Sequence, residues 1–230
     1  GLKIIKENSK VVKKNKIKAG IKFQFRDLDT FIDKNYKGQN KHIDRFRSTF
    51  LSVNNYKKLK DEVTNNKLIS ICTPFDEKSV KLIVDMQFDI LKIASCSATD
   101  WPLLEAAAKT NLPIIASTGG LSIDKIDNLV SFFEHKGVDF AIMHCVSLYP
   151  TPEDLLSINQ IDLLKKRYPG IVIGWSTHEN PENYEIIKVA YAKGARIFER
   201  HIGLETSKYK LNNYSSNEKH IEKWLKSWMM

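Results

Sequence analysis

The 230-residue sequence contains only three cysteines, Cys72, Cys96 and Cys145, and no two of them have the short spacing of a metal-binding motif. An odd number excludes complete pairing in disulfides, and each lies in an apolar run, where a free thiol packs as a small hydrophobic group. This pattern favours a reducing, cytoplasmic location over secretion. The sequence also lacks an apolar run long enough to span a membrane, and no signal peptide opens it.

Acidic residues are in the minority, because 27 Asp and Glu face 36 Lys and Arg, giving a formal net charge of +9. The lysines are spread over predicted helix surfaces instead of being concentrated on one face with aromatic residues between them, as in a nucleic-acid binder. We therefore expect neither a nucleic-acid nor a membrane partner. The positive charge is compatible with phosphorylated or carboxylated small substrates.

Short apolar runs alternate with amphipathic, helix-like stretches along the chain. The runs occupy residues 19–25, 67–75, 89–97, 112–120, 140–147, 170–178 and 195–203. Helix starts are predicted at Asp100 and Ser122, and helix ends at Gly137 and Gly194. Nearly continuous apolar strands between helices indicate a parallel sheet covered on both faces. An open doubly wound sheet is one option, but no glycine-rich phosphate turn follows the first strand. The α/β pattern favours the closed alternative, a TIM-type (β/α)8 barrel.

We expect one barrel domain over residues 1–230, because no change in composition marks a second domain. The chain opens with a helix-like stretch that should follow a strand, so the first strand of the barrel is expected upstream of Gly1. A long βα excursion over residues 27–66 is predicted to lie over the active-site face, since loops of that size are commonly lids or binding loops.

Every predicted strand ends in polar side chains, and in barrels of this type the C-terminal ends of the strands carry the chemistry. A Ser or Thr at a strand end is ordinarily a turn former. Seven such ends in register, with two lysines and two histidines among them, predict a site. The polar residues are Lys22, Gln24, Thr73, Lys92, Ser95, Ser117, Thr118, Ser147, Tyr149, His178 and His201.

The lysines and hydroxyl groups predict an anion-binding site. Lys22 and Gln24 share one side of their strand, and a lysine inside a barrel is costly unless an anion meets it. Lys92 and the glycine pair at residues 119–120, which precedes a helix, complete a cradle for phosphate or carboxylate. For Lys92, a carboxylate from a neighbouring strand remains the alternative partner.

The two histidines end adjacent strands and could together hold a divalent metal with open positions for water or substrate. We interpret His144, which lies within a strand, as a structural histidine hydrogen-bonded inside the barrel. Position alone supports neither a Ser-His-Asp nor a Cys-His nucleophile.

Seven strings together resemble the sialic acid synthases and their relatives that make nonulosonic acids. They are "KFQ", "CTPFDEKSV", "KIAS", "PLLEAAAKTNLPIIASTGG", "MHCVSLYPTP", "IGWSTHE" and "FERHIGL", and they occur in family order from Lys18 to about Leu204.

The resemblance implies a transferase on a (β/α)8 barrel that condenses phosphoenolpyruvate with an N-acetylated amino-sugar aldehyde and releases phosphate. It implies that Lys22 and Lys92, with Thr73, Ser95 and Ser117, hold phosphoenolpyruvate. Ser147 stands at a position where the family often has Asn. By the same resemblance, Gln24 and Tyr149 would line the sugar side of the site. Asn212 takes the place of a family Asp. It further implies a divalent metal on His178 and His201, typically Mn²⁺ with Mg²⁺ or Co²⁺ as alternatives, and a homodimer.

Departures from the family pattern concern the sugar side. Thr177 replaces an Asp, Ser97 replaces a Glu, and the Gly-Pro-Asp that normally follows the second histidine is missing. The family's first-strand Glu and its C-terminal antifreeze-like domain are not in this chain, so we expect the chain as given to be impaired or inactive. Two alternatives stay open. One is a sugar-phosphate aldolase or epimerase forming a Schiff base at Lys92 or Lys22. The other is a non-catalytic barrel that binds phosphoenolpyruvate or a sugar phosphate.

Overall fold

Parallel strands follow one another in chain order across a single sheet in this computed structural model, which describes residues 1–36, 38, 40–207 and 209–229. The strands are β1 (Gly20–Phe25), β2 (Ile69–Pro74), β3 (Ile90–Ile93), β4 (Ile114–Ser117), β5 (Phe140–His144), β6 (Val172–Thr177), β7 (Ile197–Ile202) and β8 (Ser215–Ser216). The α-helices are α1 (Leu2–Asn15), α2 (Leu28–Phe31), α3 (Lys41–Ser48), α4 (Val53–Asn65), α5 (Glu77–Asp85), α6 (Trp101–Ala108), α7 (Ile123–His135), α8 (Gln160–Arg167), α9 (Ile186–Ala192) and α10 (Glu218–Met229). Two 3₁₀ turns, η1 (Ser95–Ser97) and η2 (Glu153–Leu155), follow β3 and β5.

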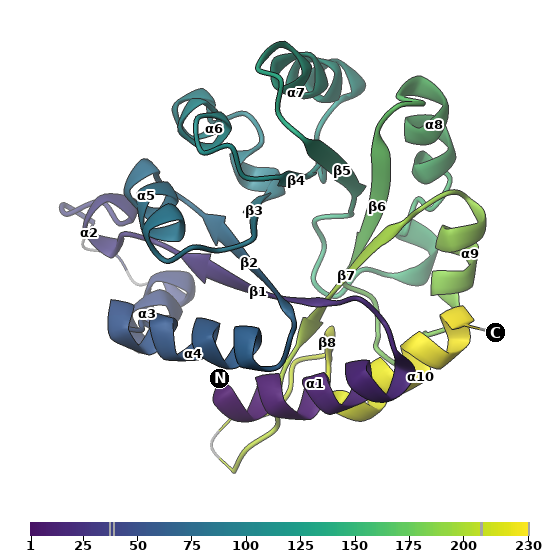
Figure 1. Cartoon of the computed structure of the whole chain (residues 1–230), viewed down its shortest axis with the longest axis horizontal. Coiled ribbons are helices and arrows are strands. Elements are labelled where there is room, and N and C mark those ends of the chain that lie inside the picture. The colour runs from purple at the N-terminus through teal and green to yellow at the C-terminus, as the bar shows by residue number, and fades with distance from the viewer. Residues whose placement is uncertain (37, 39, 208, 230) are drawn as a thin grey trace.

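The sheet curls into a barrel with its helices on the outside, which confirms the predicted α/β barrel (Figure 1). Hydrogen-bonded ladders connect each strand to the next, and within the described residues none connects β1 to β8. On that side the outer layer is continuous, because α1 and α10 lie side by side and Lys14 is ion-paired with Glu222 at 2.6 Å. At this place β1 and β7 face each other without a hydrogen-bonded ladder between them. We call it the seam.

Strand β8 was not anticipated by the sequence analysis. It has only two residues, and it pairs with His201 and Ile202 at the C-terminal end of β7. Two serines carry no apolar periodicity, so only the tertiary pairing defines this strand.

The helix boundaries follow local sequence signals. The Asp100 side chain accepts a hydrogen bond from the backbone N–H of Leu103, and Asp76 caps α5 in the same way through Ser79. Gly137 and Gly194 have φ values of 66° and 106°, as expected for glycines that end a helix and release the chain into a strand. Ser122 is the N-cap residue of α7, as predicted, although no side-chain capping bond accompanies it.

Two apolar layers result from the alternation of side chains along the strands. The larger lies between the strands and the outer helices, where β4, for example, is buried along its whole length. The smaller fills the barrel interior with Ile115, Ala141 and Met143, against which Ile90 and Ile197 pack. This interior plug supports the polar side chains that lie nearer the C-terminal ends of the strands.

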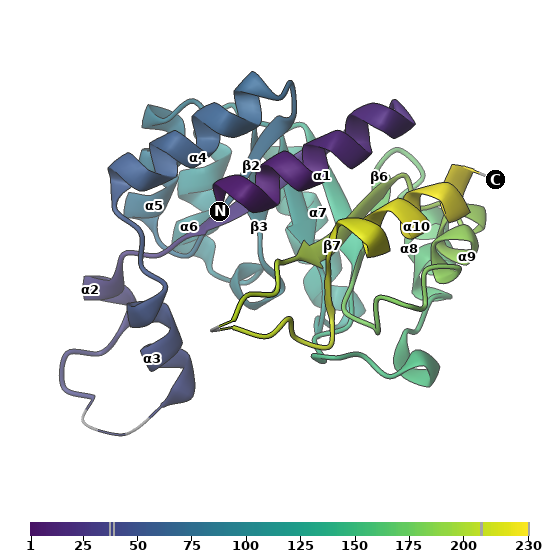
Figure 2. The same cartoon turned by 90° about the horizontal axis from the view of Figure 1, so that it is seen from below.

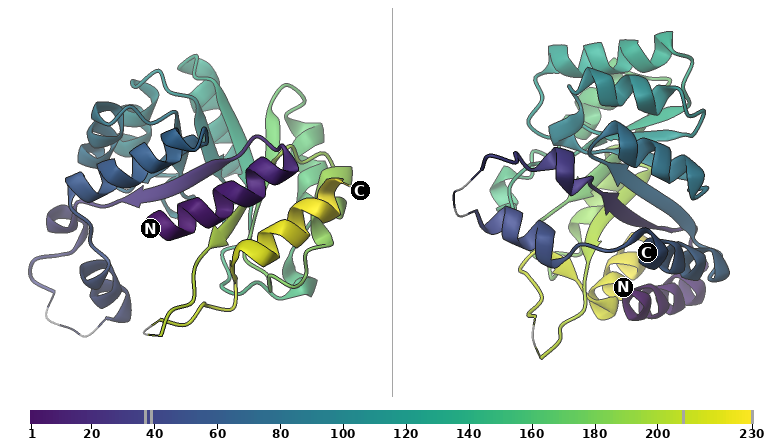
Figure 3. Two further views of the ribbon diagram at one scale, coloured as in Figure 1. Left: turned by 60° about the horizontal axis from the view of Figure 1, so that its bottom comes forward. Right: turned by 90° about the vertical axis from the view of Figure 1, so that its left-hand side faces the viewer.

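The excursion at residues 27–66 forms α2, α3 and α4. Helix α4 returns to the outer layer, where Leu59 and Val63 join a core cluster with Ile5 and Ile21. Helices α2 and α3 project from the end of β1 on the same side as the segment between β7 and β8 (Figures 2 and 3). Among the described residues, no helix combines the length and the apolar character needed to cross a bilayer.

Candidate active site

Strand register decides which side chains face the barrel interior. In the β6–β7 ladder Ser176 lies opposite Glu199, and Thr177 lies opposite Arg200. Side chains opposite each other in a parallel ladder point to the same face, and the face alternates at each residue. Ser176 and Glu199 contact the interior lysine Lys22 or each other, so they belong to the interior row. Thr177 and Arg200 belong to the outer row.

A single carboxylate holds two lysines at the centre of the site. The Nζ of Lys22 donates to Glu199 Oε1 at 2.6 Å, and the Nζ of Lys92 lies 3.9 Å from Glu199 Oε2. Ser176 Oγ donates to the same carboxylate at 3.1 Å, and Lys92 also donates to Ser117 Oγ. The structure thus supplies the carboxylate partner that the sequence left open as an alternative for Lys92.

The charges in this cluster do not cancel. Burial would raise the pKa of Glu199, but the ammonium groups of Lys92 and Lys22 outweigh it and hold the pKa well below its ordinary value. Burial lowers the pKa of Lys92 to about 8, although Glu199 opposes the shift. At neutral pH two ammonium groups therefore share one carboxylate, and the cluster retains a positive charge that an anion can neutralise.

Small and hydroxylated residues form a surface next to Lys92. The Gly119 N–H donates to Ser95 Oγ at 2.9 Å, and that hydroxyl lies 3.1 Å from Cys145 Sγ. The nearby Thr73 Oγ1, on the interior row of β2, is buried and has no hydrogen-bond partner among the described residues. An unpaired buried hydroxyl is costly, and a ligand oxygen would satisfy it.

Gly119 packs so closely against its neighbours that no side chain fits at this position. A Cβ there would lie 2.6 Å from Cys145 Sγ, 2.7 Å from Ser147 Oγ and 3.0 Å from Ser95 Oγ. Because a Cβ would displace these side chains, we expect Gly119→Ala to weaken binding of inorganic phosphate, the anion that the predicted cradle would hold, at least tenfold by isothermal titration calorimetry, with an unchanged far-UV circular dichroism spectrum. Gly170→Ala is the matched control, since a Cβ at Gly170 meets nothing within 4 Å. Equal affinities of the two variants would contradict a cradle at Gly119.

The two predicted metal-ligating histidines lie together, with 5.2 Å between their ring centroids. The His178 ring is fixed by a 3.0 Å hydrogen bond between Nδ1 and the Val146 carbonyl oxygen, so Nδ1 carries the proton and Nε2 keeps its lone pair. Burial lowers the pKa of both rings, for His201 to about 4 with His178 contributing. Two neutral imidazoles with free nitrogens fit a divalent metal. No third His, Cys, Asp or Glu completes a cluster in the part of the chain that is described.

Two tyrosines surround the histidine pair. The ring centroid of Tyr149 lies 4.1 Å from that of His178, and the ring of Tyr214 lies 5.2 Å from that of His201. Sequence reasoning identified Tyr149 and missed Tyr214, which lies in a segment without a recognisable motif. Asn212 is exposed, and its side-chain oxygen accepts from the Tyr214 N–H at 3.3 Å, so its predicted contact with a substrate stays a prediction. It supports the turn that brings Tyr214 to the histidines.

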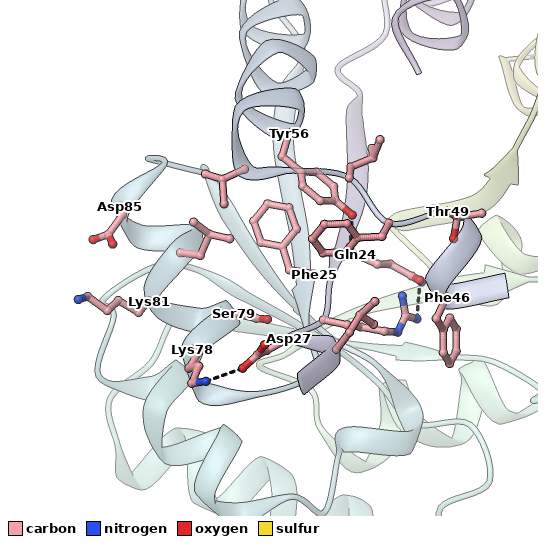
Figure 4. A pocket seen from close by; sticks show the side chains of 16 residues that line it. Gln24, Phe25, Asp27, Phe46, Thr49, Tyr56, Lys78, Ser79, Lys81 and Asp85 are labelled. Carbon is pink, nitrogen blue, oxygen red and sulfur yellow. Dashed lines mark hydrogen bonds and ion pairs between the residues drawn. The ribbon is translucent and has the colours of Figure 1, made fainter. Parts of the chain in front are cut away.

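Gln24 borders a cavity of about 430 Å³ that residues of β1 and of α2 to α5 line. Its side-chain oxygen accepts from Arg26 Nη2 at 2.8 Å, and Figure 4 shows it beside Phe25 and Tyr56. Its predicted contact with the sugar stays a prediction. His144 bonds the Leu156 carbonyl oxygen through Nε2 at 3.0 Å, so it is hydrogen-bonded and structural as predicted, but it lies on the outer row opposite Trp175 and not inside the barrel.

The fold and the site define an α/β-barrel protein that gathers two interior lysines, hydroxyl groups and an imidazole pair at the C-terminal ends of its strands. The chain belongs to the NeuB family, whose model matches residues 11–226. The resemblance to sialic acid synthases stated from the sequence motifs is thereby confirmed.

Relatives of known structure or name agree with this assignment. A Chromobacterium violaceum protein described as spore coat polysaccharide biosynthesis protein E is 44% identical to this chain, with a TM-score of 0.96. The superposition covers 99% of this chain and 68% of the Chromobacterium chain. The N-acetylneuraminic acid synthetase of Leptospira borgpetersenii, solved in complex with citrate, is 29% identical, with a TM-score of 0.88. The superposition covers 99% of this chain and 76% of the Leptospira chain. The N-acetylneuraminate-9-phosphate synthase of Drosophila melanogaster is 38% identical over 57% of this chain and 35% of its own length. The chain spans about half of the length of the curated relatives it matches.

Proposed function

We propose that this protein condenses phosphoenolpyruvate with an N-acetylated amino-sugar aldehyde to give a sialic-acid-like nonulosonic acid and phosphate. The observation that carries the proposal is the lysine pair on Glu199, which keeps a positive charge beside two neutral imidazoles. One part of the site suits an anionic substrate and the other a metal-assisted carbonyl group. Membership of the NeuB family supports the synthesis of such nine-carbon acids.

The residues of this chain have separate tasks in the reaction. The ammonium groups of Lys22 and Lys92, with the hydroxyls of Thr73 and Ser117, bind the phosphate and carboxylate groups of phosphoenolpyruvate. The enol carbon attacks the aldehyde carbon, water adds to the cationic carbon that is left, and the tetrahedral intermediate expels phosphate. The lysines stabilise the negative charge that grows on the departing phosphate, which is where preorganised donors lower a barrier most.

His178 and His201 would hold the divalent metal, for which we propose Mn²⁺. When bound, the metal supplies Lewis-acid polarisation of the aldehyde oxygen. The Val146 carbonyl fixes the tautomer of His178 so that Nε2 is free for this role. Tyr149 and Tyr214 enclose the pair and would exclude bulk water from it. We propose a homodimer as the assembly, with phosphoenolpyruvate and an amino sugar as substrates.

Phosphate release tests the proposal directly. The protein expressed from its complete gene is incubated with phosphoenolpyruvate, Mn²⁺ and a panel of N-acetylated amino sugars, with and without a chelator. Sugar-dependent release that the chelator abolishes is the expected result, and the active sugar identifies the acceptor. Binding of phosphoenolpyruvate without release for any sugar would overturn the catalytic proposal and leave an anion-binding barrel.

The affinity for phosphoenolpyruvate is expected to depend on pH through Lys92. Its pKa is about 8 in the free protein, and a bound anion favours the charged ammonium, so binding takes up a proton above that pH. The affinity should be nearly constant below pH 8 and fall by up to about tenfold per pH unit above it. Calorimetric titrations between pH 7 and 9.5 measure this slope. A Lys92→Met variant should bind more weakly and lose the dependence near pH 8.

The lowered pKa of Lys92 also suits a second chemistry, because a partly neutral lysine is a nucleophile for carbonyl groups. An aldolase on the same barrel would form a Schiff base there. Borohydride reduction in the presence of a sugar phosphate, followed by mass spectrometry, distinguishes the two. We expect no adduct at Lys92, and a trapped adduct would favour the aldolase.

A further inference from the structure

A buried ion pair lies behind the two histidines, on the outer face of the same strands. Arg200 Nη1 is 3.2 Å from Glu179 Oε1, and Arg200 Nη2 donates to the backbone carbonyl oxygen of Glu179 at 3.2 Å. Only 1% of the Arg200 side chain and none of the Glu179 side chain is exposed. The guanidinium also lies 5.5 Å from the centre of the Trp224 ring of α10, which covers it from outside.

The position of the pair along the strands links it to the site. Glu179 directly follows His178, and Arg200 directly precedes His201. The backbone ladder between β6 and β7 ends at Thr177 and Arg200, so His178 lies beyond its last pairing. Past that point, Arg200 and Glu179 form an ion pair and a hydrogen bond between the two chain segments behind the rings, which themselves pack against each other.

The hydrogen bonds that the structure describes fix each histidine separately, whereas the rings of Tyr149 and Tyr214 pack against both imidazoles without a polar bond. The His178 carbonyl oxygen accepts from the Thr151 N–H at 3.0 Å, and the His178 ring is bonded to Val146. His201 is paired with Ser215 of β8. These bonds tie the histidines to different loops, whereas the ion pair ties the two histidine-bearing segments to each other.

Stability alone is a poor reason for burying these charges. Two ions lose their hydration on burial, and a well-packed apolar pair of similar size is often equally stable or more so. Here both Glu179 carboxylate oxygens and the Arg200 Nε lack a hydrogen-bond partner among the described residues, so the charges are incompletely satisfied. A contact that costs desolvation and is not optimised for stability is explained by the geometry it imposes.

We propose that the Glu179–Arg200 ion pair is a positioning device that sets the separation of the His178 and His201 imidazoles, and thereby the affinity of the histidine pair for a divalent cation. The inference rests on the metal-binding role of the histidines in the proposed function. Glu179 and Arg200 do not touch the metal or the substrates in this arrangement, and they act through the residues next to them.

The test replaces the pair by apolar residues of similar size and measures metal binding without substrates. The double variant Glu179→Leu/Arg200→Met should fold with a midpoint of thermal unfolding close to that of the parent. Its affinity for Mn²⁺, from calorimetry and from the electron paramagnetic resonance signal of free Mn²⁺, should be about 10 to 100 times weaker, the usual effect of losing an outer-shell partner. Asp127→Leu/Arg167→Met removes an ion pair between α7 and α8 by the same substitutions and should leave Mn²⁺ affinity unchanged.

Arg200→Lys serves as a second variant, because it keeps the charge but replaces the planar guanidinium, whose two Nη atoms contact the carboxylate and the carbonyl oxygen, by a flexible point charge. An intermediate loss of Mn²⁺ affinity is expected for Arg200→Lys. If the double variant does not fold, the Mn²⁺ affinity of Arg200→Lys tests the positioning role of the ion pair. Parental affinity in a folded double variant, or in Arg200→Lys, would overturn the inference. If the parent chain binds Mn²⁺ no better than His178→Ala does, the metal site itself is wrong, and the inference falls with it.

Discussion

Glu199→Gln is expected to lower the free energy of unfolding by about 1.5 to 3 kcal/mol, because it removes the carboxylate from a partly buried cluster and leaves the ammonium groups of Lys22 and Lys92 uncompensated. For a chain of this size, the change should lower the midpoint of thermal unfolding by roughly 5 to 10 °C. Urea denaturation at pH 7, followed by tryptophan fluorescence, measures the difference.

The pH dependence of the destabilisation by Glu199→Gln shows whether its cause is electrostatic. The parent Lys92 has a pKa of about 8, and loss of the Glu199 charge lowers that pKa further, so the ammonium loses its proton more readily in the variant. The destabilisation should therefore shrink as the pH rises to about 8 and stay constant above it, where Lys92 is neutral in both proteins. Glu105→Gln removes the partner of Lys136 in an exposed pair and should change the midpoint little. A loss for Glu199→Gln that does not depend on pH would point to packing as its cause.

His178→Ala is expected to weaken Mn²⁺ binding by at least a hundredfold and to abolish sugar-dependent phosphate release. One imidazole of a two-histidine site holds a divalent ion poorly, and the replaced ring is the one whose free Nε2 is fixed by the Val146 carbonyl. His135→Ala, at the exposed end of α7, is the matched control and should bind Mn²⁺ like the parent chain. Retained Mn²⁺ affinity in His178→Ala would remove the histidine pair from the proposed metal site.

The barrel and most of its site residues could be predicted because their signals are local. Apolar runs that end in polar residues define the strands and place Lys22, Lys92, His178 and His201 at one end of a parallel sheet. The motifs then identified the family, which the comparisons confirm.

What the sequence could not provide are the pairings across the sheet. The sequence places Glu199 near the end of a strand. It does not indicate that this carboxylate contacts both lysines, because those contacts depend on how the sheet curls. Tyr214 and the two-residue β8 have no periodic pattern, and the Glu179–Arg200 pair faces away from the barrel interior. The hydrogen bond of Asn212 within the turn before β8 is likewise a contact that no sequence motif indicates.

The Lys22–Glu199 ion pair also governs when the site can form. It joins β1 to β7 across the seam, between residues 177 positions apart in the chain. Contacts between such distant residues form late, because a long loop must close before they are made. On the ribosome, a nascent chain carries both lysines well before their carboxylate partner emerges. The Lys22–Glu199 contact is therefore expected to form late in folding, together with the curvature of the whole sheet.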